Sequence, residues 1–119
     1  MGVTVALTLA ALAFLAARRA YFWTKAVLTM QRVDAIQNAY HSYNMWNPSA
    51  EWPKLDDLSK ELNAFHLKVD SEGRPIDYYG NPMTLPKGDG EYVVLSPETY
   101  EKIRNLVPVP RENAPPSVQ

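Results

Sequence analysis

The sequence predicts an α+β protein in which a long N-terminal membrane and stalk helix packs on a small antiparallel sheet. No Gly or Pro interrupts residues 3–47, so one helix can run through this whole segment. Short segments of alternating apolar and polar residues follow between positions 64 and 95, separated by turns rich in Gly and Pro. The chain has 119 residues, which is enough for one small domain beside such a helix.

Residues 1–17 form an uncharged apolar segment, and counted to Trp23 it is long enough to cross a bilayer. We therefore predict a transmembrane anchor at 1–23. The residues expected at the membrane interface are Arg18, Arg19, Tyr21, Phe22 and Trp23, because arginine snorkels toward water and aromatic rings favour the headgroup level. A cleaved secretory signal and a buried helix of a soluble protein are the alternatives. A secretory signal carries positive charge before its apolar segment, and none is present here.

Small residues recur at spacings of three and four along this anchor, which places them on one side of the helix. They are Gly2, Ala6, Ala10, Ala13 and Ala17. Small side chains allow a second transmembrane helix to approach closely, so we expect helix packing here. The expected partners are the lipid bilayer and either helices of other membrane proteins or copies of this chain. An Ala-rich composition without a packing role is the alternative.

A stalk helix is predicted at 24–47, because apolar residues continue along one side of the same helix. They are Trp23, Ala26, Met30, Val33, Ile36, Tyr40 and Tyr43. Pro48 disfavours helical geometry at the preceding residue and ends the helix there.

A small soluble α+β domain is predicted at 48–106. It begins with a short helix in which Pro53 occupies the first turn and three leucines form the inner side, namely Leu55, Leu58 and Leu62. The expected strands are 64–69, 76–79, 83–85 and 91–95, with a hairpin joining the last two. Ser96 is predicted to cap a last helix that extends to about Leu106. The tail at 107–119 is rich in Pro, so we expect it to be extended.

The composition indicates no catalytic, cofactor-binding or metal-binding residue. Cysteine is absent, which excludes disulfides and thiolate metal sites, and the net charge of -1 does not favour nucleic acid as a partner. His41 and His66 are the only histidines and are interpreted as surface residues. Asp56 and Asp57 are adjacent and point in different directions on a helix, so they form no catalytic pair. We expect a protein that is not an enzyme.

Three short motifs resemble type IV pilins and the major pseudopilins of type II secretion. Residues 77–82 (Asp-Tyr-Tyr-Gly-Asn-Pro) resemble their Asp-Pro-Trp-Gly-Asn-Pro turn, and 90–96 resemble the Gly-Glu-Tyr strand that follows it. Residues 52–58 resemble the pilin loop in which Tyr-Pro precedes a Leu-Asp-Asp-Leu helix. The resemblance implies a pilin-like fold and a structural turn formed by Asp77, Gly80, Asn81 and Pro82. In that turn Gly80 can take a positive φ, and the carboxylate of Asp77 can accept backbone N–H groups.

The N-terminal segment departs from the pilin pattern. Pilin precursors carry a basic leader, and mature pilins carry a Glu at their fifth position, but no acidic residue precedes Arg18 here. Two functions remain open. One is a non-catalytic structural or assembly subunit that resembles a pseudopilin. The other is an accessory single-pass subunit that stabilises a larger membrane complex, for example a photosynthetic or respiratory one.

The expected location is the inner membrane of a bacterial cell. If Met1 is the true start, the basic residues that follow the apolar segment favour a cytoplasmic domain, since Lys and Arg concentrate on the cytoplasmic side. These residues are Arg18, Arg19, Lys25 and Arg32. The pilin resemblance implies the opposite side, and removal of a basic leader would also reverse the orientation.

Overall fold

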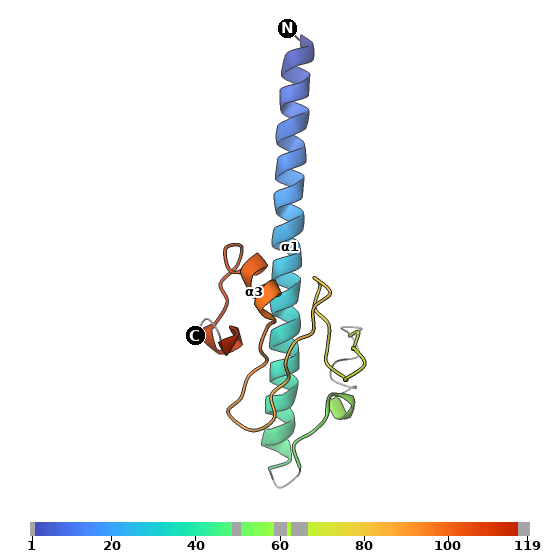
Figure 1. The fold of residues 1–119 in the computed structure, drawn as a ribbon, viewed down its shortest axis with the longest axis vertical. Coiled ribbons are helices and arrows are strands. Elements are labelled where there is room, and N and C mark those ends of the chain that lie inside the picture. Colours follow the sequence, from blue (N-terminus) through green and yellow to red (C-terminus); the bar gives the residue numbers. More distant parts are fainter. Residues whose placement is uncertain (1, 49–50, 59–61, 63–66, 117–119) are drawn as a thin grey trace.

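A computed structural model describes residues 2–48, 51–58, 62 and 67–116. The molecule is an elongated body of 73 × 31 × 26 Å. One helix, α1 (Gly2–Trp46), runs through its whole length, and the rest of the chain surrounds only the half that is remote from the N-terminus (Figure 1). The remaining helical elements are η1 (Leu55–Leu58), α3 (Pro97–Ile103) and η3 (Arg111–Asn113). We call the described residues from 51 to 116 the module.

The predicted continuous helix is confirmed, and it ends at Trp46, one residue before the predicted boundary. Beyond it the amide of Asn47 still donates to the carbonyl of Tyr43 at 2.9 Å. Pro48 then prevents a further turn, since the residue before a proline avoids helical geometry. Residues 2–24 are exposed along their whole length, whereas burial begins at Lys25 and recurs on one side as far as Tyr40.

The core lies between this buried side of α1 and the module. Fully buried side chains come from the stalk half of α1, from the leucines around η1, and from the segment between residues 83 and 103. They are Val33, Ile36, Leu58, Met83, Val93, Leu95 and Ile103. The predicted inner leucines behave as expected, because Leu58 and Leu62 are buried and Leu55 packs against the same cluster. The stalk helix is therefore the central scaffold of the core.

The predicted antiparallel sheet is wrong, and with it the expected pilin-like fold. Within residues 2–48, 51–58, 62 and 67–116, β-pairing is limited to three isolated antiparallel bridges: Val69 with Pro75, Ile76 with Pro82, and Thr84 with Val94. The expected hairpin 83–85/91–95 thus pairs at one position only, and the part of strand 64–69 before residue 67 lies outside the described residues.

Prolines explain why these bridges do not extend. Pro75 accepts from the amide of Met83 but has no N–H group to return, and Pro82 lies two residues before Thr84, where the next donor to the segment of Val94 would be needed. Pro86 follows the third bridge closely and has the same effect. The alternating pattern correctly indicated extended chain, but extended chain without a row of donors cannot form a sheet.

Helix α3 begins as predicted, since Ser96 is its N-cap and accepts from the amide of Thr99, with Pro97 in the first turn. It ends at Ile103 rather than Leu106. The amides of Leu106 and Val107 turn back to the carbonyl of Ile103, because Pro108 disfavours helical geometry at Val107.

The tail from 107 to 116 is not an isolated extended segment, contrary to expectation. It contains η3, and Asn113, Ala114 and Pro115 are buried against the module. The Asn113 amide holds it there by donating to the carbonyl of Val93 at 2.7 Å.

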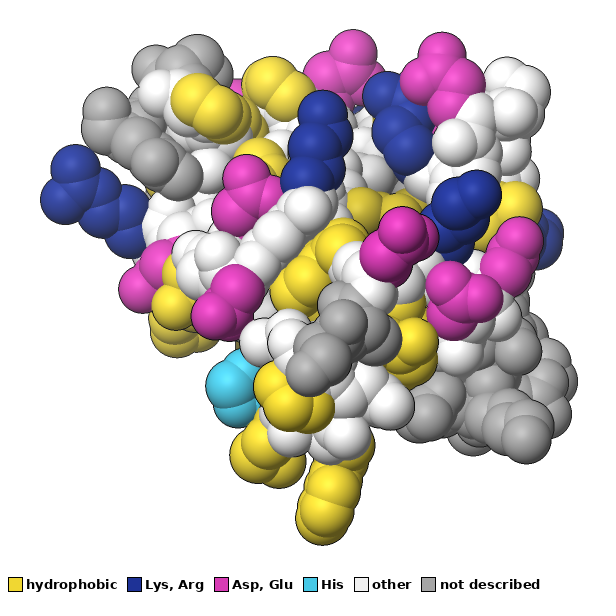
Figure 2. Space-filling view, turned by 90° about the horizontal axis from the view of Figure 1, so that it is seen from below, with side chains coloured by type: hydrophobic (Ala, Val, Ile, Leu, Met, Phe, Trp, Pro, Cys, Tyr) yellow, Lys and Arg dark blue, Asp and Glu magenta, His cyan; other side chains and the backbone are white. Residues whose placement is uncertain are grey.

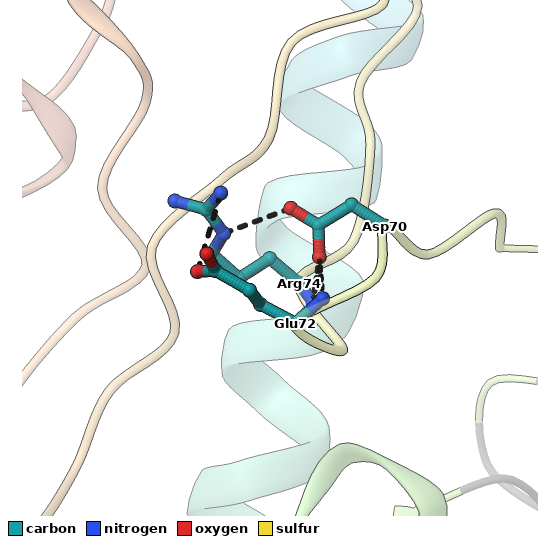
Figure 3. Close-up of polar contacts among 3 residues, drawn as sticks. All are labelled: Asp70, Glu72 and Arg74. Carbon is teal, nitrogen blue, oxygen red and sulfur yellow. Dashed lines mark hydrogen bonds and ion pairs between the residues drawn. The ribbon is translucent and has the colours of Figure 1, made fainter.

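An exposed turn carries the closest ion pair of the module. The carboxylate of Asp70 accepts from the amides of Glu72 and Arg74 and from Nε of Arg74 at 2.9 Å (Figure 3). These hydrogen bonds, the backbone bond from Arg74 first, hold the pKa of Asp70 below its ordinary value of 3.8. The turn is thus held mainly by local contacts.

Candidate membrane anchor and its junction with the module

The anchor segment of α1, residues 2–24, has the length and composition of a membrane span. Over an 18-residue window of α1 the mean hydropathy reaches 1.6, and no part of that window is buried inside the molecule. At about 1.5 Å per residue it covers about 35 Å, slightly more than the hydrocarbon core of a typical bilayer. Among the described residues, α1 is the one helix that is long and apolar enough to cross a membrane.

The stripe of Gly2, Ala6, Ala10, Ala13 and Ala17 is exposed at every position. With 3.6 residues per turn it is centred roughly 130° around the helix axis from the side that carries the module. The side chains of the stripe are exposed, while Asn105 and Leu106 of the module line a cavity with Ala16, Ala20 and Trp23 on a neighbouring side of the same helix.

The predicted interface residues form a ring just before the module begins. Tyr21 and Phe22 meet edge to face with ring centroids 5.7 Å apart, and the guanidinium of Arg18 lies 5.5 Å from the Phe22 centroid. Trp23 is 52% exposed and Arg19 is also exposed. Amphipathic aromatic side chains with cations beside them suit the boundary between hydrocarbon and water.

Within the module, the turn at 77–82 is held against α3. Gly80 has φ of 81°, in the left-handed region, and Oδ1 of Asp77 accepts from the amides of Tyr79 and Asn81 at 2.8 and 3.1 Å. The hydroxyl of Thr99 in α3 donates to Oδ2 of Asp77 at 2.6 Å. Asn81 donates its side-chain amide to the same hydroxyl, while Pro82 forms the bridge to Ile76. This network fixes the turn against α3.

Three polar residues connect α1 to the module, a role that the sequence analysis did not predict for any of them. Arg32 donates from Nη1 to the carbonyl of Ile76 at 2.9 Å, and its guanidinium lies 4.2 Å from the Tyr78 ring centroid. Oε1 of Gln37 accepts from the amide of Val93 and from the side chain of Asn113. In the sequence, Arg32 and Gln37 are polar residues next to the apolar side of the stalk, and this position could have indicated their role. No pattern in the Pro-rich tail indicated a role for Asn113.

A stacked aromatic pair closes the far end of this interface. The rings of Tyr40 and Trp52 lie 5.5 Å apart and nearly parallel, and Nε1 of Trp52 donates to the carbonyl of Pro86. Burial, together with the carboxylate of Asp57, raises the pKa of Tyr40 to about 12, so its hydroxyl is protonated at neutral pH. The pair therefore acts as packing rather than as a titrating group.

The described residues contain no group of three or more His, Asp or Glu side chains suited to a metal ion. His41 is exposed on α1, and His66 lies outside the described residues. Asp56 and Asp57 are exposed in η1, where the carboxylate of Asp57 accepts from the amide of Lys54. Asp57 thus caps a short helix, and Asp56 lies exposed beside it.

No family model matches this chain, and comparisons with curated proteins and with solved structures find no match.

Proposed function

We propose that this protein is a non-catalytic structural subunit that is anchored in a membrane by one helix and stabilises a larger membrane assembly. The observation that carries the proposal is the exposure of α1 from residue 2 to residue 24. Such a large apolar surface is not stable in water, so lipid or protein must cover it. The small-residue stripe favours a protein helix on one side and lipid on the others.

The shape of the molecule supports this role. The anchor continues without a break into the scaffold of the module, so a force or a contact on one is transmitted to the other through a single helix (Figure 1). The module end remote from the N-terminus carries acidic and basic side chains interspersed with apolar ones, as on a hydrated surface (Figure 2). An anchor on one side and a hydrated module on the other suit an accessory subunit.

Assembly with copies of the same chain, as in pseudopilins, is the second candidate. The observation that favours it is the turn at 77–82, in which Asp77 and Gly80 have the geometry that the resemblance implied. The lack of a sheet among the described residues and of an acid before Arg18 favours the accessory role.

Membrane extraction tests the anchor. The full-length protein is expected to stay with membranes through high-salt and alkaline washing and to be released by detergent. Release by salt alone would refute the anchor, and with it the proposed function.

Substitutions in the stripe test the protein partner. Ala13→Leu is expected to weaken recovery of the native particle, because a larger side chain prevents close helix approach. Ala11→Leu is the matched control, since Ala11 lies on a different side of the helix. Electron microscopy of the wild-type particle then separates a discrete complex from a filament. Equal recovery of the particle with both variants would show that the stripe is not the contact with the partner helix.

The proposed location is the bacterial inner membrane, with the module on the cytoplasmic side. Arg18, Arg19 and Lys25 follow the apolar segment and favour this side. Protease added to intact spheroplasts should leave the module whole until lysis. Digestion from outside would place it on the other side.

A further inference from the structure

Two lysines from distant parts of the chain meet at the junction of anchor and module. Lys25 lies on α1 one residue after the exposed segment ends, and Lys102 lies in the last turn of α3. Their ammonium groups lie 4.9 and 5.5 Å from the centroid of the same ring, that of Tyr79. Two positive charges thus lie beside one aromatic ring where the helix leaves the anchor.

These lysines line a cavity of about 470 Å³ together with Phe22, Tyr79, Asn105 and Leu106. No acidic residue contributes to its lining. In the part of the chain that the structure describes, neither lysine forms an ion pair with a carboxylate. Like charges in a concave site repel one another, and an anion placed between them removes that repulsion.

Three acidic residues lie close to these lysines in the fold or in the chain. Asp77 affects the titration of Tyr79, but its carboxylate accepts from two backbone amides and from Thr99. Glu101, next to Lys102 in α3, pairs with Arg104 at 3.3 Å, and Glu98, four residues before Lys102, forms no ion pair with it. Among the described residues, no carboxylate therefore forms an ion pair with either lysine.

Tyr79 adds a polar group to the cavity. Its hydroxyl oxygen is buried and has no hydrogen-bond partner in the described structure. Burial, the carboxylate of Asp77 and the nearby Tyr21 raise its pKa, so the hydroxyl keeps its proton and can donate. A buried donor without a partner is costly, so this hydroxyl leaves an unsatisfied polar group next to the cavity.

A second cavity of about 350 Å³ adjoins the first, since Asn105 and Leu106 line both. Its other lining residues are Ala16, Arg19, Ala20 and Trp23, which belong to the anchor. Ala16, Ala20 and Trp23 thus continue an apolar surface from the basic cavity toward the hydrocarbon, with the cationic Arg19 beside them. The loop after α3 lies beside α1 at this level (Figure 1).

We propose that this junction binds an anionic phospholipid, with its phosphate between Lys25 and Lys102 and an acyl chain along Ala16, Ala20 and Trp23. Asn105 supplies a hydrogen bond to the headgroup, and the ring of Tyr79 lies beside it. The bound lipid holds α3 against the helix and fixes the height of the module at the membrane surface. This inference rests on the membrane anchoring proposed above.

Native mass spectrometry of the full-length protein in an uncharged maltoside detergent tests the site. Phosphatidylglycerol should bind more tightly than phosphatidylcholine with the same acyl chains. Lys25→Gln and Lys102→Gln should each weaken phosphatidylglycerol binding about fivefold, since one lysine at a membrane surface contributes about 1 kcal/mol. Lys68→Gln is the matched control, because Lys68 is exposed in the module and lines neither cavity.

Three results would overturn the proposal: equal binding of the two lipids, no loss in either lysine variant, or equally tight binding of inorganic phosphate alone, which would indicate a free-anion site. Lys102 is exposed, so its variant should keep the wild-type melting temperature and remain informative if Lys25→Gln does not fold. If the protein resists alkaline washing but does not prefer phosphatidylglycerol, the lipid site is refuted and the membrane anchor stands. Release by salt alone would instead refute the anchor, and the lipid site with it.

Discussion

The two halves of α1 share one continuous backbone but differ in what surrounds their side chains. Residues 2–24 are exposed and apolar on every side, with Arg18, Arg19 and Lys25 at the boundary. Residues 25–46 bury one side only, and that side includes polar groups such as Arg32 and Thr29. A helix surrounded by lipid needs no polar side, whereas a helix that organises a hydrated module needs one apolar side and a few correctly placed donors and acceptors.

The comparison also shows how the module is held without a sheet. Backbone groups that a neighbouring strand would normally satisfy are instead paired with side chains of the stalk. Arg32 supplies a donor to Ile76, and Gln37 supplies an acceptor to Val93. The module is therefore structurally dependent on the stalk, while the anchor contributes nothing to the described core.

Core truncation in the stalk should give the largest difference between the two halves. Ile36→Ala removes a fully buried side chain and is expected to lower the free energy of unfolding of the module by about 2–5 kcal/mol. Leu12→Ala removes a side chain of the same size from the anchor, where Leu12 is 58% exposed, and should leave that free energy unchanged. Near-ultraviolet circular dichroism during thermal unfolding in detergent measures both. Equal losses would mean that the anchor also stabilises the module.

Removal of the Gln37 amide should have the next largest effect. Gln37→Ala leaves the amide of Val93 and the side chain of Asn113 without their acceptor, which we expect to cost about 1–3 kcal/mol of module stability. The neighbouring Asn38→Ala is the control, because Asn38 is exposed. Chemical denaturation in detergent gives both values.

A double-mutant cycle sharpens this prediction. Asn113→Ala and Gln37→Ala should be less than additive in their effect on the free energy of unfolding, since both remove the same 2.8 Å hydrogen bond. Full additivity would contradict the role of this bond in holding the tail to the stalk.

The backbone of the turn at 77–82 is tested by a matched pair of glycines. Gly80→Ala should lower module stability by about 1–2 kcal/mol, because a side chain disfavours its φ of 81°. Gly88→Ala places the same methyl group at a glycine without a positive φ, and neither position has an atom within 4 Å of the added carbon. Thermal unfolding should separate the two variants, and identical melting temperatures would exclude backbone strain as the reason for glycine at 80.

The smallest expected effect belongs to the exposed Asp70 turn. The pKa of Asp70 is lowered in the folded protein, so its contribution to stability is present above pH 3.8, its ordinary pKa, and is lost as the pH falls through the folded-state value. Asp70→Asn should therefore lower the melting temperature slightly at neutral pH and hardly at all in strong acid. A constant difference across this range would mean that the charge of Asp70 does not stabilise the turn.

Local sequence determined the helix, its end at Pro48, the cap at Ser96 and the inner leucines of η1. Each depends on residues within one or two turns of one another, so the pattern carries the information directly. The prediction of a sheet was wrong, because alternation indicates extended chain but does not reveal whether neighbouring segments can exchange hydrogen bonds. Pro75 lacks the N–H group that would extend the bridge of Ile76 with Pro82, and Pro82 and Pro86 lack those that would extend the bridge of Thr84 with Val94.

Tertiary structure alone decided which groups replaced the sheet and which residues meet at the membrane junction. Arg32 and Ile76 are 44 positions apart, and Gln37 and Asn113 are 76 apart, so no local pattern relates them. The same holds for Lys25 and Lys102, which share the ring of Tyr79 only because α3 packs against the stalk. By itself, the sequence determined an apolar anchor joined to an amphipathic stalk. The partners of its polar groups were set by long-range packing, since a buried donor or acceptor must be satisfied by whatever the folded chain brings near it.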